Sequence, residues 1–313
     1  MKHVLITGVN GFVGRHLARA FWAVNYQVDG LTANEPLAKQ LTGVVTNVFQ
    51  CDLADRSAVS KLELSGYDVI VNLAGLANVG KSFDQPELYL RINVDVLRFI
   101  GKRALDQNPN IRLIAISSGA VYDSDQPMPL TENSAVSADT SPYAASKLAM
   151  EQAANKLQVD GLDCVVVRPF NHFGLGQESG FILPDLYDGL VRAVSKNEPL
   201  SVGNLTTKRD YTDVRDIVQA YVLLADAPKS TLTKKLYNVC SGTPLSGNDI
   251  LEALRRQIPK TSAVEILEDK TRFRKNDPQE LVGSNERLVA DTGWQPKIEL
   301  TKTIRDFVTE RSA

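Results

Sequence analysis

The chain has 313 residues, enough for about two domains or one large one. Apolar residues make up 43% and charged residues 23%, which is typical of globular proteins and excludes a disordered chain, a collagen-like repeat and a coiled coil. The 35 Lys and Arg and 37 Asp and Glu give a net charge of −2. The chain therefore lacks the basic surplus of most nucleic-acid binders and of strongly cationic membrane-surface proteins.

The chain also shows no sign of a disulfide framework, a zinc site or a membrane segment. Its cysteines, Cys51, Cys164 and Cys240, are few and scattered, and the last two lie in apolar runs, which predicts reduced core cysteines. No apolar run approaches the roughly 20 residues of a membrane helix. The N-terminal apolar run ends at Gly8, too early for a signal-peptide core. We therefore expect a cytoplasmic protein with no bound metal.

Short β-rich runs alternate with helical patterns through the first half of the chain. In chain order they predict a strand at 3–7, a helix at 14–24, a strand at 68–73, a helix at 87–105, a strand at 112–117, a helix at 143–157 and a strand at 164–167. The strands are continuously apolar rather than alternating, which predicts a parallel sheet buried on both faces. Strand–helix alternation on this scale is typical of a doubly wound α/β domain.

The pattern weakens after about residue 170. Gly, Pro and Asn become frequent between Asn171 and Asn204. One further helix is predicted at 214–225 and one further strand at 236–240, and the rest of the C-terminal part indicates short helices and turns. We therefore predict an α/β domain formed by 1–170 with about 212–240. A smaller, largely C-terminal domain would consist of about 171–211 with 241–313.

A glycine-rich turn joins the first predicted strand to the first predicted helix. Gly8 allows a tight turn, Gly11 lets the backbone approach a pyrophosphate, and Gly14 lets helix and strand pack closely. Free N–H groups at the helix N-terminus, where Phe12 and Val13 lie, attract phosphate oxygens. A glycine pattern alone is weak, but its place between strand and helix predicts a nucleotide site on a Rossmann-type doubly wound parallel sheet.

The stretch 27–31, which contains Asp29, is also interpreted as a strand, and its end bears on which cofactor is bound. Asp29 lies about where an acidic residue would bond the adenosine 2′-hydroxyl, but the strand is expected to end nearer Thr32. The tip then offers neither a carboxylate to repel a 2′-phosphate nor an arginine to hold one, which slightly favours NADP(H) over NAD(H). Asp52, after the apolar stretch 44–51, is placed to accept a bond from the adenine amino group. Its alternative role is a helix N-cap.

Tyr143 and Lys147 lie four residues apart on a predicted helix and so share one face. An unperturbed tyrosine has a pKa near 10, and a nearby ammonium lowers that pKa toward the working range of an acid–base group. This spacing is common by chance, so its value depends on its partners. Ser118 follows the predicted strand at 112–117, at the edge where open α/β sheets bind ligands, and its hydroxyl suits a substrate carbonyl. Alone, Ser118 would be a turn residue.

With these residues in place, the sequence resembles the extended short-chain dehydrogenase/reductases, and within them the sugar-nucleotide epimerase/dehydratase group. The matching segments span almost the whole chain in the family's order: GVNGFVG (8–14), CDL (51–53), NLAG (72–75), SSGAVY (117–122), SPYAASK (141–147), RPFNHFGLGQ (168–177), GNLTTKRDYTDVRD (203–216), YNVCSG (237–242) and VGSNERLVADTGWQP (282–296). The resemblance implies an NAD(P)-dependent enzyme that acts on a nucleotide-diphosphate sugar. It also implies that Leu53, Leu73, Ala74 and Gly75 line the cofactor site.

The resemblance further implies which residues hold the substrate. Arg209 and Arg274 match arginines that contact the diphosphate, and a planar guanidinium suits that task because it bonds two oxygens at once. Asn171 matches an asparagine on the sugar or the diphosphate. The alternative for Arg209 is a surface salt bridge with Asp210 or Asp213.

Within the group the resemblance is strongest to reductases of GDP-linked 4-keto-6-deoxyhexoses. Leu175 and Asp123 depart from their pattern, which has proline and glycine there. Gly119 and Ala120 stand where 4,6-dehydratases have acidic residues and 3,5-epimerase/reductases have a cysteine, so neither of those activities is favoured. His172 has no visible partner and is expected to serve packing or loop structure rather than catalysis.

The implied activity is hydride transfer from NAD(P)H to the C4 ketone of a nucleotide-linked 4-keto-6-deoxyhexose. Tyr143 would donate the proton, Lys147 would lower the pKa of Tyr143 and orient the ribose, and Ser118 would polarise the carbonyl. A nucleotide-sugar 4-epimerase with tightly bound NAD stays open, as do a 4,6-dehydratase and a non-catalytic nucleotide sensor. Family dimers pair through the helix that bears the tyrosine, so a homodimer is also expected, with the helix at 87–105 as the second element.

Overall fold

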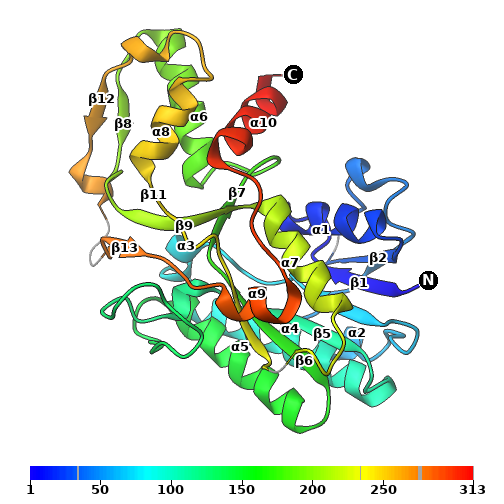
Figure 1. Ribbon diagram of the computed structural model, residues 1–313. Coiled ribbons are helices and arrows are strands. Elements are labelled where there is room, and N and C mark those ends of the chain that lie inside the picture. The colour runs from blue at the N-terminus through cyan, green and yellow to red at the C-terminus, as the bar shows by residue number, and fades with distance from the viewer. Residues whose placement is uncertain (34, 233, 274–276, 313) are drawn as a thin grey trace.

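The structure is a computed structural model that describes residues 1–33, 35–232, 234–273 and 277–312. Within these residues the centre of the fold is a seven-stranded parallel sheet in the order β10-β6-β5-β4-β1-β2-β3 (Figure 1). Its strands are β1 (His3–Thr7), β2 (Gln27–Thr32), β3 (Asn47–Gln50), β4 (Val69–Asn72), β5 (Arg112–Ile116), β6 (Asp163–Pro169) and β10 (Leu236–Val239). The predicted parallel sheet is confirmed.

Helices cover both faces of this sheet. Its helices are α1 (Phe12–Ala23), α2 (Arg56–Val59), α3 (Val79–Ser82), α4 (Pro86–Gln107), α5 (Pro142–Val159) and α7 (Val214–Asp226). Side chains alternate between faces along a strand, so Val4 and Ile6 of β1 pack with α1 and α7, whereas Leu5 packs with α4 and α5. The inner strands β1, β4, β5 and β6 are therefore buried on both sides, which is why they are mostly apolar, whereas the edge strand β3 is largely exposed.

The order of the strands places the ligand crevice. The chain winds outward from β1 to β2 and β3, and then returns to β4, on the other side of β1. The connections after β1 and β4 diverge at this switch point, at the carboxyl edge of the sheet, where doubly wound folds have the crevice that binds ligands. The predicted Rossmann-type α/β fold is confirmed.

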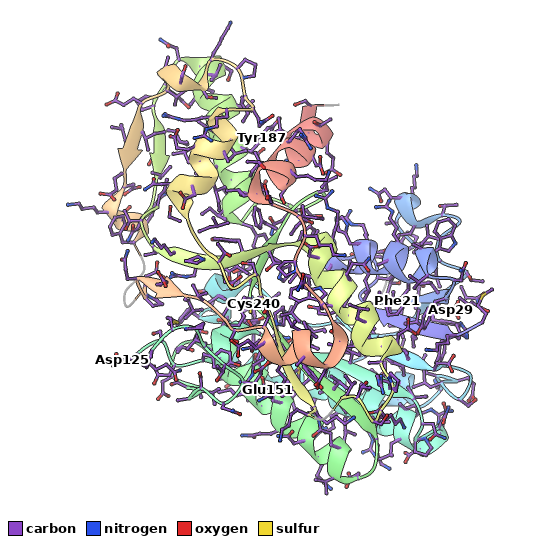
Figure 2. The ribbon with its side chains drawn as sticks, in the orientation of Figure 1. Phe21, Asp29, Asp125, Glu151, Tyr187 and Cys240 are labelled. Atoms are coloured by element: carbon purple, nitrogen blue, oxygen red, sulfur yellow. The ribbon has the colours of Figure 1, made fainter. Side chains whose placement is uncertain are left out.

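A smaller body, at the top of Figure 1, is formed mostly by C-terminal segments. Its elements and those that join it to the sheet are β7 (Asn171–Phe173), α6 (Ile182–Lys196), β8 (Leu200–Val202), β9 (Lys208–Asp213), β11 (Pro244–Ser246), α8 (Gly247–Arg255), β12 (Ile266–Glu268), β13 (Glu280–Leu281), α9 (Glu286–Thr292) and α10 (Leu300–Ser312). Short 3-10 turns are η1 (Lys39–Leu41), η2 (Gly119–Val121), η3 (Thr261–Ala263) and η4 (Lys270–Arg272). The smaller body has its own core, which includes Leu190, Leu254 and Phe307. Figure 2 shows Tyr187 in this body and Phe21 beside the sheet.

The smaller body contains regular structure that the sequence did not predict. The stretch from Asn171 to Asn204 was expected to be irregular, yet it contains α6, of 15 residues. Leu183, Leu186 and Leu190 lie on the buried face of α6 at helical spacing, and Asn197 ends the helix in the left-handed conformation, with φ 54°. The frequent glycines and prolines around the helix hid this periodic signal.

The predicted domain boundaries stay a prediction. Leu288 and Trp294, from the C-terminal segment, are buried in the cluster that covers the α1 and α7 face of the sheet. Asp216 of α7 holds the chain just beyond them, because its carboxylate accepts hydrogen bonds from the backbone N–H groups of Lys297 (2.9 Å) and Ile298 (2.8 Å). The C-terminal segment therefore packs on the sheet before it enters the smaller body as α10.

Over the described ranges, no helix combines the length and the apolar character needed to cross a bilayer. The three cysteines are free thiols and buried, and no cluster of three or more potential metal ligands is found among the described residues.

Candidate active site

The glycine turn after β1 has the geometry that a bound phosphate requires. Gly8 has a φ of 66°, which favours glycine, and its N–H donates to the Leu31 carbonyl (2.9 Å). A Cβ on Gly14 would lie 2.7 Å from the Val9 carbonyl oxygen, so only glycine fits there. Helix α1 begins at Phe12 and its N-cap, Gly11, has no capping side chain. No capping side chain therefore accepts from the first N–H groups of the helix, at Phe12 and Val13, and a pyrophosphate contact from them stays a prediction.

The turn after β4 forms the opposite wall of the crevice. The Thr7 hydroxyl donates to Asn72 Oδ1 (2.8 Å) and accepts from the Ala74 N–H (3.0 Å), which ties the ends of β1 and β4 together. A Cβ on Gly8 would lie 3.2 Å from the Ala74 nitrogen. The predicted cofactor residues Leu73 and Ala74 thus lie directly beside the glycine turn, and Gly75, next along the chain, lies beside Asn93 and Lys147.

The second strand ends at Thr32, as the sequence predicts. Asp29 is buried in mid-strand, where its carboxylate bonds His3 Nε2 (2.9 Å), the Tyr67 hydroxyl (2.8 Å) and the Asn47 N–H (3.1 Å). It therefore fastens the sheet and is not free for a ribose. The Thr32 hydroxyl donates to the Glu35 carbonyl (2.6 Å).

Asp52 lies in the turn after β3 and is exposed, and Leu53 beside it is buried. Asp52 Oδ1 accepts a hydrogen bond from the Ala54 N–H (2.9 Å). The alternative that Asp52 is a helix N-cap is wrong, because Asp55 caps α2 through the Ser57 N–H. A contact from Asp52 to an adenine stays a prediction.

The structure brings the three predicted catalytic side chains together. Ser141 caps α5 through the Ala144 N–H (3.1 Å), so Tyr143 and Lys147 lie in the first turns of that helix. The Tyr143 hydroxyl is hydrogen-bonded to Ser118. Lys147 Nζ lies 5.8 Å from the centre of the Tyr143 ring and donates to the Ile116 carbonyl (2.8 Å). This arrangement suits proton transfer to a carbonyl held at Ser118.

Burial and charge tune this group. Burial raises the pKa of Tyr143, and the hydrogen bond from Ser118 counteracts this rise. Burial lowers the pKa of Lys147 to about 8, and the negative charge of Glu151 counteracts this fall. Lys147 therefore carries its positive charge beside Tyr143 at neutral pH and loses it under mildly alkaline conditions.

Two residues of α4 that the sequence did not single out support the site. The Tyr89 ring meets Tyr143 edge to face, with ring centres 6.5 Å apart, and the Tyr89 hydroxyl donates to the Asn78 carbonyl (2.6 Å). Asn93 accepts from the Leu76 N–H (2.8 Å) and donates to the hydroxyl of Ser146 (2.9 Å). Their only signal in the sequence is helical spacing, which core residues share.

Arg209 lies in β9 and is largely buried. Its guanidinium donates to the Asp277 carboxylate and to the Pro278 carbonyl (2.9 Å). The salt-bridge partners considered from the sequence are wrong. Asp210 instead accepts hydrogen bonds from the chain at 241, 242 and 283, and Asp213 pairs with its neighbour two residues on. A diphosphate contact from Arg209 stays a prediction.

Arg274 lies outside the described residues. Asn171 is exposed at the start of β7, just beyond the carboxyl end of β6. His172 Nδ1 bonds the Phe170 carbonyl (3.0 Å), and its ring lies parallel to that of Phe12 with ring centres 6.2 Å apart. The packing role expected for His172 agrees with these contacts.

The loop that contains Leu175 joins the two bodies. His16 Nε2 bonds the Leu175 carbonyl (2.8 Å), and Arg15 donates to the Gly176 carbonyl (3.0 Å). The Gly176 N–H donates to the carboxylate of Glu310 in α10 (2.6 Å). The helix beside the glycine turn is thus connected to the C-terminal helix through this loop.

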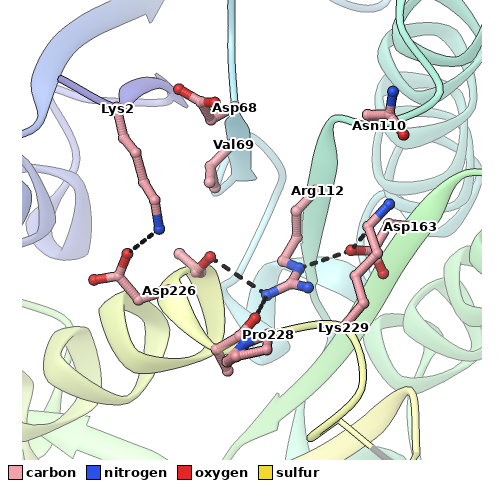
Figure 3. A pocket seen from close by; sticks show the side chains of 11 residues that line it. Lys2, Asp68, Val69, Asn110, Arg112, Asp163, Asp226, Pro228 and Lys229 are labelled. Atoms are coloured by element: carbon pink, nitrogen blue, oxygen red, sulfur yellow. Dashed lines mark hydrogen bonds and ion pairs between the residues drawn. The ribbon is translucent and has the colours of Figure 1, made fainter.

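Figure 3 shows a pocket of about 240 Å³ at the amino ends of β4, β5 and β6, on the other edge of the sheet. Its charged side chains bond one another and the backbone: Lys2 pairs with Asp226, and Arg112 pairs with Asp163 and donates to carbonyls at the end of α7. Because these contacts satisfy the charges and ligands bind at the carboxyl edge, we assign this pocket a structural role.

Known proteins resemble this chain over nearly its whole length. Residues 4–240 match the NAD dependent epimerase/dehydratase family. The chain is 29% identical to GDP-6-deoxy-D-mannose reductase of Pseudomonas aeruginosa, over 99% of this chain and 97% of that protein. It is 28% identical to UDP-glucose 4-epimerase of Bacillus subtilis, over 97% and 95%.

A solved structure is similar to this chain over its whole length. RMD from Pseudomonas aeruginosa, complexed with NADPH, superposes with a TM-score of 0.83 at 26% identity, over 100% of both chains. The chain therefore belongs to the NAD dependent epimerase/dehydratase family and is an NAD(P)-dependent enzyme.

Proposed function

We propose that the protein reduces the C4 ketone of a nucleotide-linked 4-keto-6-deoxyhexose, and that it favours GDP-4-keto-6-deoxymannose, which it converts to GDP-rhamnose. The observation that carries this proposal is the similarity to GDP-6-deoxy-D-mannose reductase along 99% of the chain. Other relatives are UDP-glucose 4-epimerases. The reductase and the epimerase candidates therefore share one substrate class, the nucleotide sugars.

The proposed mechanism uses the three side chains that meet in the crevice. Bound NAD(P)H supplies the hydride. Ser118 donates a hydrogen bond to the C4 oxygen and stabilises the negative charge that develops there. Tyr143 gives its proton to that oxygen, and the Lys147 ammonium stabilises the phenolate that remains.

The residues after Ser118 favour a reductase over a dehydratase. A Cβ on Gly119 would lie 2.9 Å from the Phe170 ring, so a side chain does not fit at this position. Ala120, next to it, has no group that moves a proton. The acidic residues that would eliminate water therefore have no counterpart beside Ser118.

A nucleotide-sugar 4-epimerase is the second candidate, because UDP-glucose 4-epimerase of Bacillus subtilis is similar over 97% of the chain. An epimerase returns the hydride it removes, so it needs no added reductant and keeps its cofactor. Denatured protein would then release one NAD per chain, and UDP-glucose would be converted to UDP-galactose without added NADH.

The deciding experiment measures NADPH and NADH oxidation with freshly made GDP-4-keto-6-deoxymannose and, in parallel, with the dTDP-linked ketosugar. We expect rapid oxidation with the GDP substrate. No oxidation with either ketosugar, together with tightly bound NAD, would replace the reductase with the epimerase.

We propose NADPH as the preferred reductant. The supporting observation is that the Asp29 carboxylate is bonded within the sheet and therefore does not oppose a 2′-phosphate. The same assay tests this preference: kcat/KM for NADPH should exceed that for NADH, and the reverse order would refute it.

We also propose a homodimer that pairs through α4 and α5. These helices pack side by side on one face of the sheet, and α4 exposes Leu90, which is 48% accessible. Light scattering should give twice the chain mass, and Leu90→Glu should reduce it. A monomer at micromolar concentration would refute this proposal.

A further inference from the structure

Glu151 lies on the same face of α5 as the proposed catalytic pair. Tyr143, Lys147 and Glu151 follow one another at intervals of four residues, and all three are buried. A buried carboxylate is stable only where hydrogen bonds and an opposite charge compensate it. The contacts of Glu151 therefore show what it does in the fold.

The Glu151 carboxylate is bonded to the ends of two neighbouring strands. Oε1 accepts from the Ser117 hydroxyl (2.5 Å) and from Arg168 Nε (2.8 Å), and Oε2 accepts from Arg168 Nη2 (2.6 Å). Ser117 directly follows β5 and Arg168 lies in β6. These bonds join α5 to the sheet at the edge where the crevice opens; Figure 2 labels Glu151 in the lower half of the molecule, where α5 runs.

Ser117 separates two residues that contact the catalytic pair. The carbonyl of Ile116 accepts from Lys147 Nζ (2.8 Å), and Ser118 is hydrogen-bonded to Tyr143. The Ser117 N–H donates to the Val167 carbonyl (2.7 Å), which fixes its backbone. Glu151 fixes its side chain. The distance between the end of β5 and α5 is therefore fixed by two contacts of Ser117, one to β6 and one to α5.

The charges around the pair give Glu151 a second effect. Arg168 compensates Glu151 and lies 4.7 Å from the centre of the Tyr122 ring. The other titratable groups near the pair are Tyr89 on α4 and Tyr221 on α7, which are neutral at pH 7. Glu151 is thus the negative charge that acts on Lys147 and opposes the fall in its pKa caused by burial.

We propose that Glu151 is a positioning residue, which holds Ser118 and Lys147 at their working separation through Ser117 and places a negative charge beside the Lys147 ammonium. This inference rests on the proposed function, because it assigns Glu151 a part in the same site. The proposal assigns Glu151 no contact with the substrate or the cofactor.

The test compares Glu151→Gln with the wild type in the ketosugar reduction. The amide removes the charge and nearly keeps the shape, so kcat should fall about 10-fold or more while the KM for NADPH stays within about twofold. The alkaline limb of kcat/KM should move to lower pH by about one unit, because loss of a negative charge lowers the apparent pKa values of the Tyr143–Lys147 pair.

Asp160→Asn is the matched control, since Asp160 is an exposed carboxylate at the end of the same helix and pairs with Lys156. Its pH profile and kcat should equal those of the wild type. A folded Glu151→Gln protein with wild-type kcat and an unmoved alkaline limb would overturn the proposal.

Ser117→Ala tests the mechanical link separately and serves where Glu151→Gln does not fold. It removes one hydroxyl and leaves the charge of Glu151, so kcat should fall about three- to tenfold with the alkaline limb unmoved. Wild-type kcat in Ser117→Ala would show that the link does not position the site.

A measurement without turnover separates this inference from the proposed function. Acetylation of Lys147 by acetic anhydride, followed by mass spectrometry across pH, reports its neutral fraction. The midpoint should lie lower in Glu151→Gln than in the wild type. If the wild type reduces neither ketosugar, the proposed function fails; if the two midpoints coincide, the charge effect of Glu151 fails.

Discussion

Lys147 lowers the folding stability of the protein because its charged side chain is buried at the proposed catalytic site. Burial lowers its pKa from the usual 10.5 to about 8 in the folded protein. The unfolded chain therefore binds this proton more tightly, and the charged lysine opposes folding at neutral pH. This loss of folding stability is complete below about pH 8. It becomes smaller as the pH rises from there, and it disappears above the pKa that the lysine has in the unfolded chain.

Lys147→Met should consequently be inactive but more stable at pH 7. A pKa shift of this size corresponds to a destabilisation of about 3 kcal/mol, which the variant no longer carries. The variant also loses the hydrogen bond to the Ile116 carbonyl, which costs about 1 kcal/mol. We therefore expect a net gain of about 2 kcal/mol in the free energy of unfolding. Urea titrations at pH 7 and pH 10 should show the gain shrinking at the higher pH. Lys156→Met, on the exposed face of the same helix, should change little. A destabilised Lys147→Met would contradict this.

Tyr143→Phe tests the proton donor itself. Turnover should fall by about 10²- to 10⁴-fold because the ring stays and only the transferable proton is lost. NADPH affinity, measured by fluorescence titration, should stay within about threefold. Tyr187→Phe, in the core of the smaller body, is the control. Turnover within tenfold of wild type would remove Tyr143 from the mechanism.

At the scale of single residues, the sequence predicted those side chains that carry a reactive group and whose position depends only on a nearby helix or strand. Ser118, Tyr143 and Lys147 each carry a reactive group, and the end of a strand or the start of a helix places each of them. Glu151, Tyr89 and Asn93 act through contacts between segments far apart in the chain, so helical spacing marks them only as buried. Arg209 is a further case, since its partner Asp277 is 68 residues away and the nearby acids, Asp210 and Asp213, bond other groups.

At the scale of elements, the turn between β1 and α1 is the most constrained part of the site. Close packing of Gly14 on the Gly8–Val9 backbone brings the start of α1 up to the crevice. The same approach leaves no room for a Cβ at Gly14, so both the packing and the predicted phosphate contact require glycine there.

Gly14→Ala should therefore lose cofactor affinity and stability together. Its Cβ would lie 2.7 Å from the Val9 carbonyl oxygen and would push the helix away, at about 1–3 kcal/mol. NADPH titration and thermal unfolding would measure both effects. Gly66→Ala is the control, because a Cβ there meets nothing within 4 Å. Unchanged NADPH affinity in Gly14→Ala would show that the turn does not hold the phosphates.

The inner strands of the sheet were predictable because each is a mostly apolar run between turns. The helices and strands predicted in chain order each match an observed one to within a few residues, namely β1, α1, β4, α4, β5, α5, β6, α7 and β10. The smaller body was harder because its strands have two to six residues and pair across long separations, as β13 pairs with β9. Such short strands carry no periodic pattern, and their pairing depends on the rest of the fold.

At the scale of the whole molecule, α7 connects the two bodies. Asp213 caps this helix and also bonds Arg215, which pairs with Asp306 of α10. One turn away, Asp216 holds the segment that leads into α10, and the Asp216 carbonyl accepts from Trp294 Nε1 (3.0 Å). The C-terminal part of the chain is thus fixed to the sheet body by a few buried acids.

Asp216→Ala should release this segment. Two backbone N–H groups, at Lys297 and Ile298, would lose their partner, which costs about 2 kcal/mol. Limited proteolysis should then cut faster near residues 295–300. Asp216→Asn keeps an acceptor oxygen and should be cut more slowly than Asp216→Ala. Equal cutting in wild type and Asp216→Ala would mean that other contacts hold the segment.

The position of β10 also has a consequence for how the protein is made. Strand β6 is complete at Pro169, but its outer neighbour, β10, begins only at Leu236. At translation rates of roughly 5–20 residues per second, that edge stays unpaired on the ribosome for several seconds. All seven residues of β6 are buried in the finished protein, so the nascent chain presents an apolar strand edge of the kind that recruits chaperones or other chains.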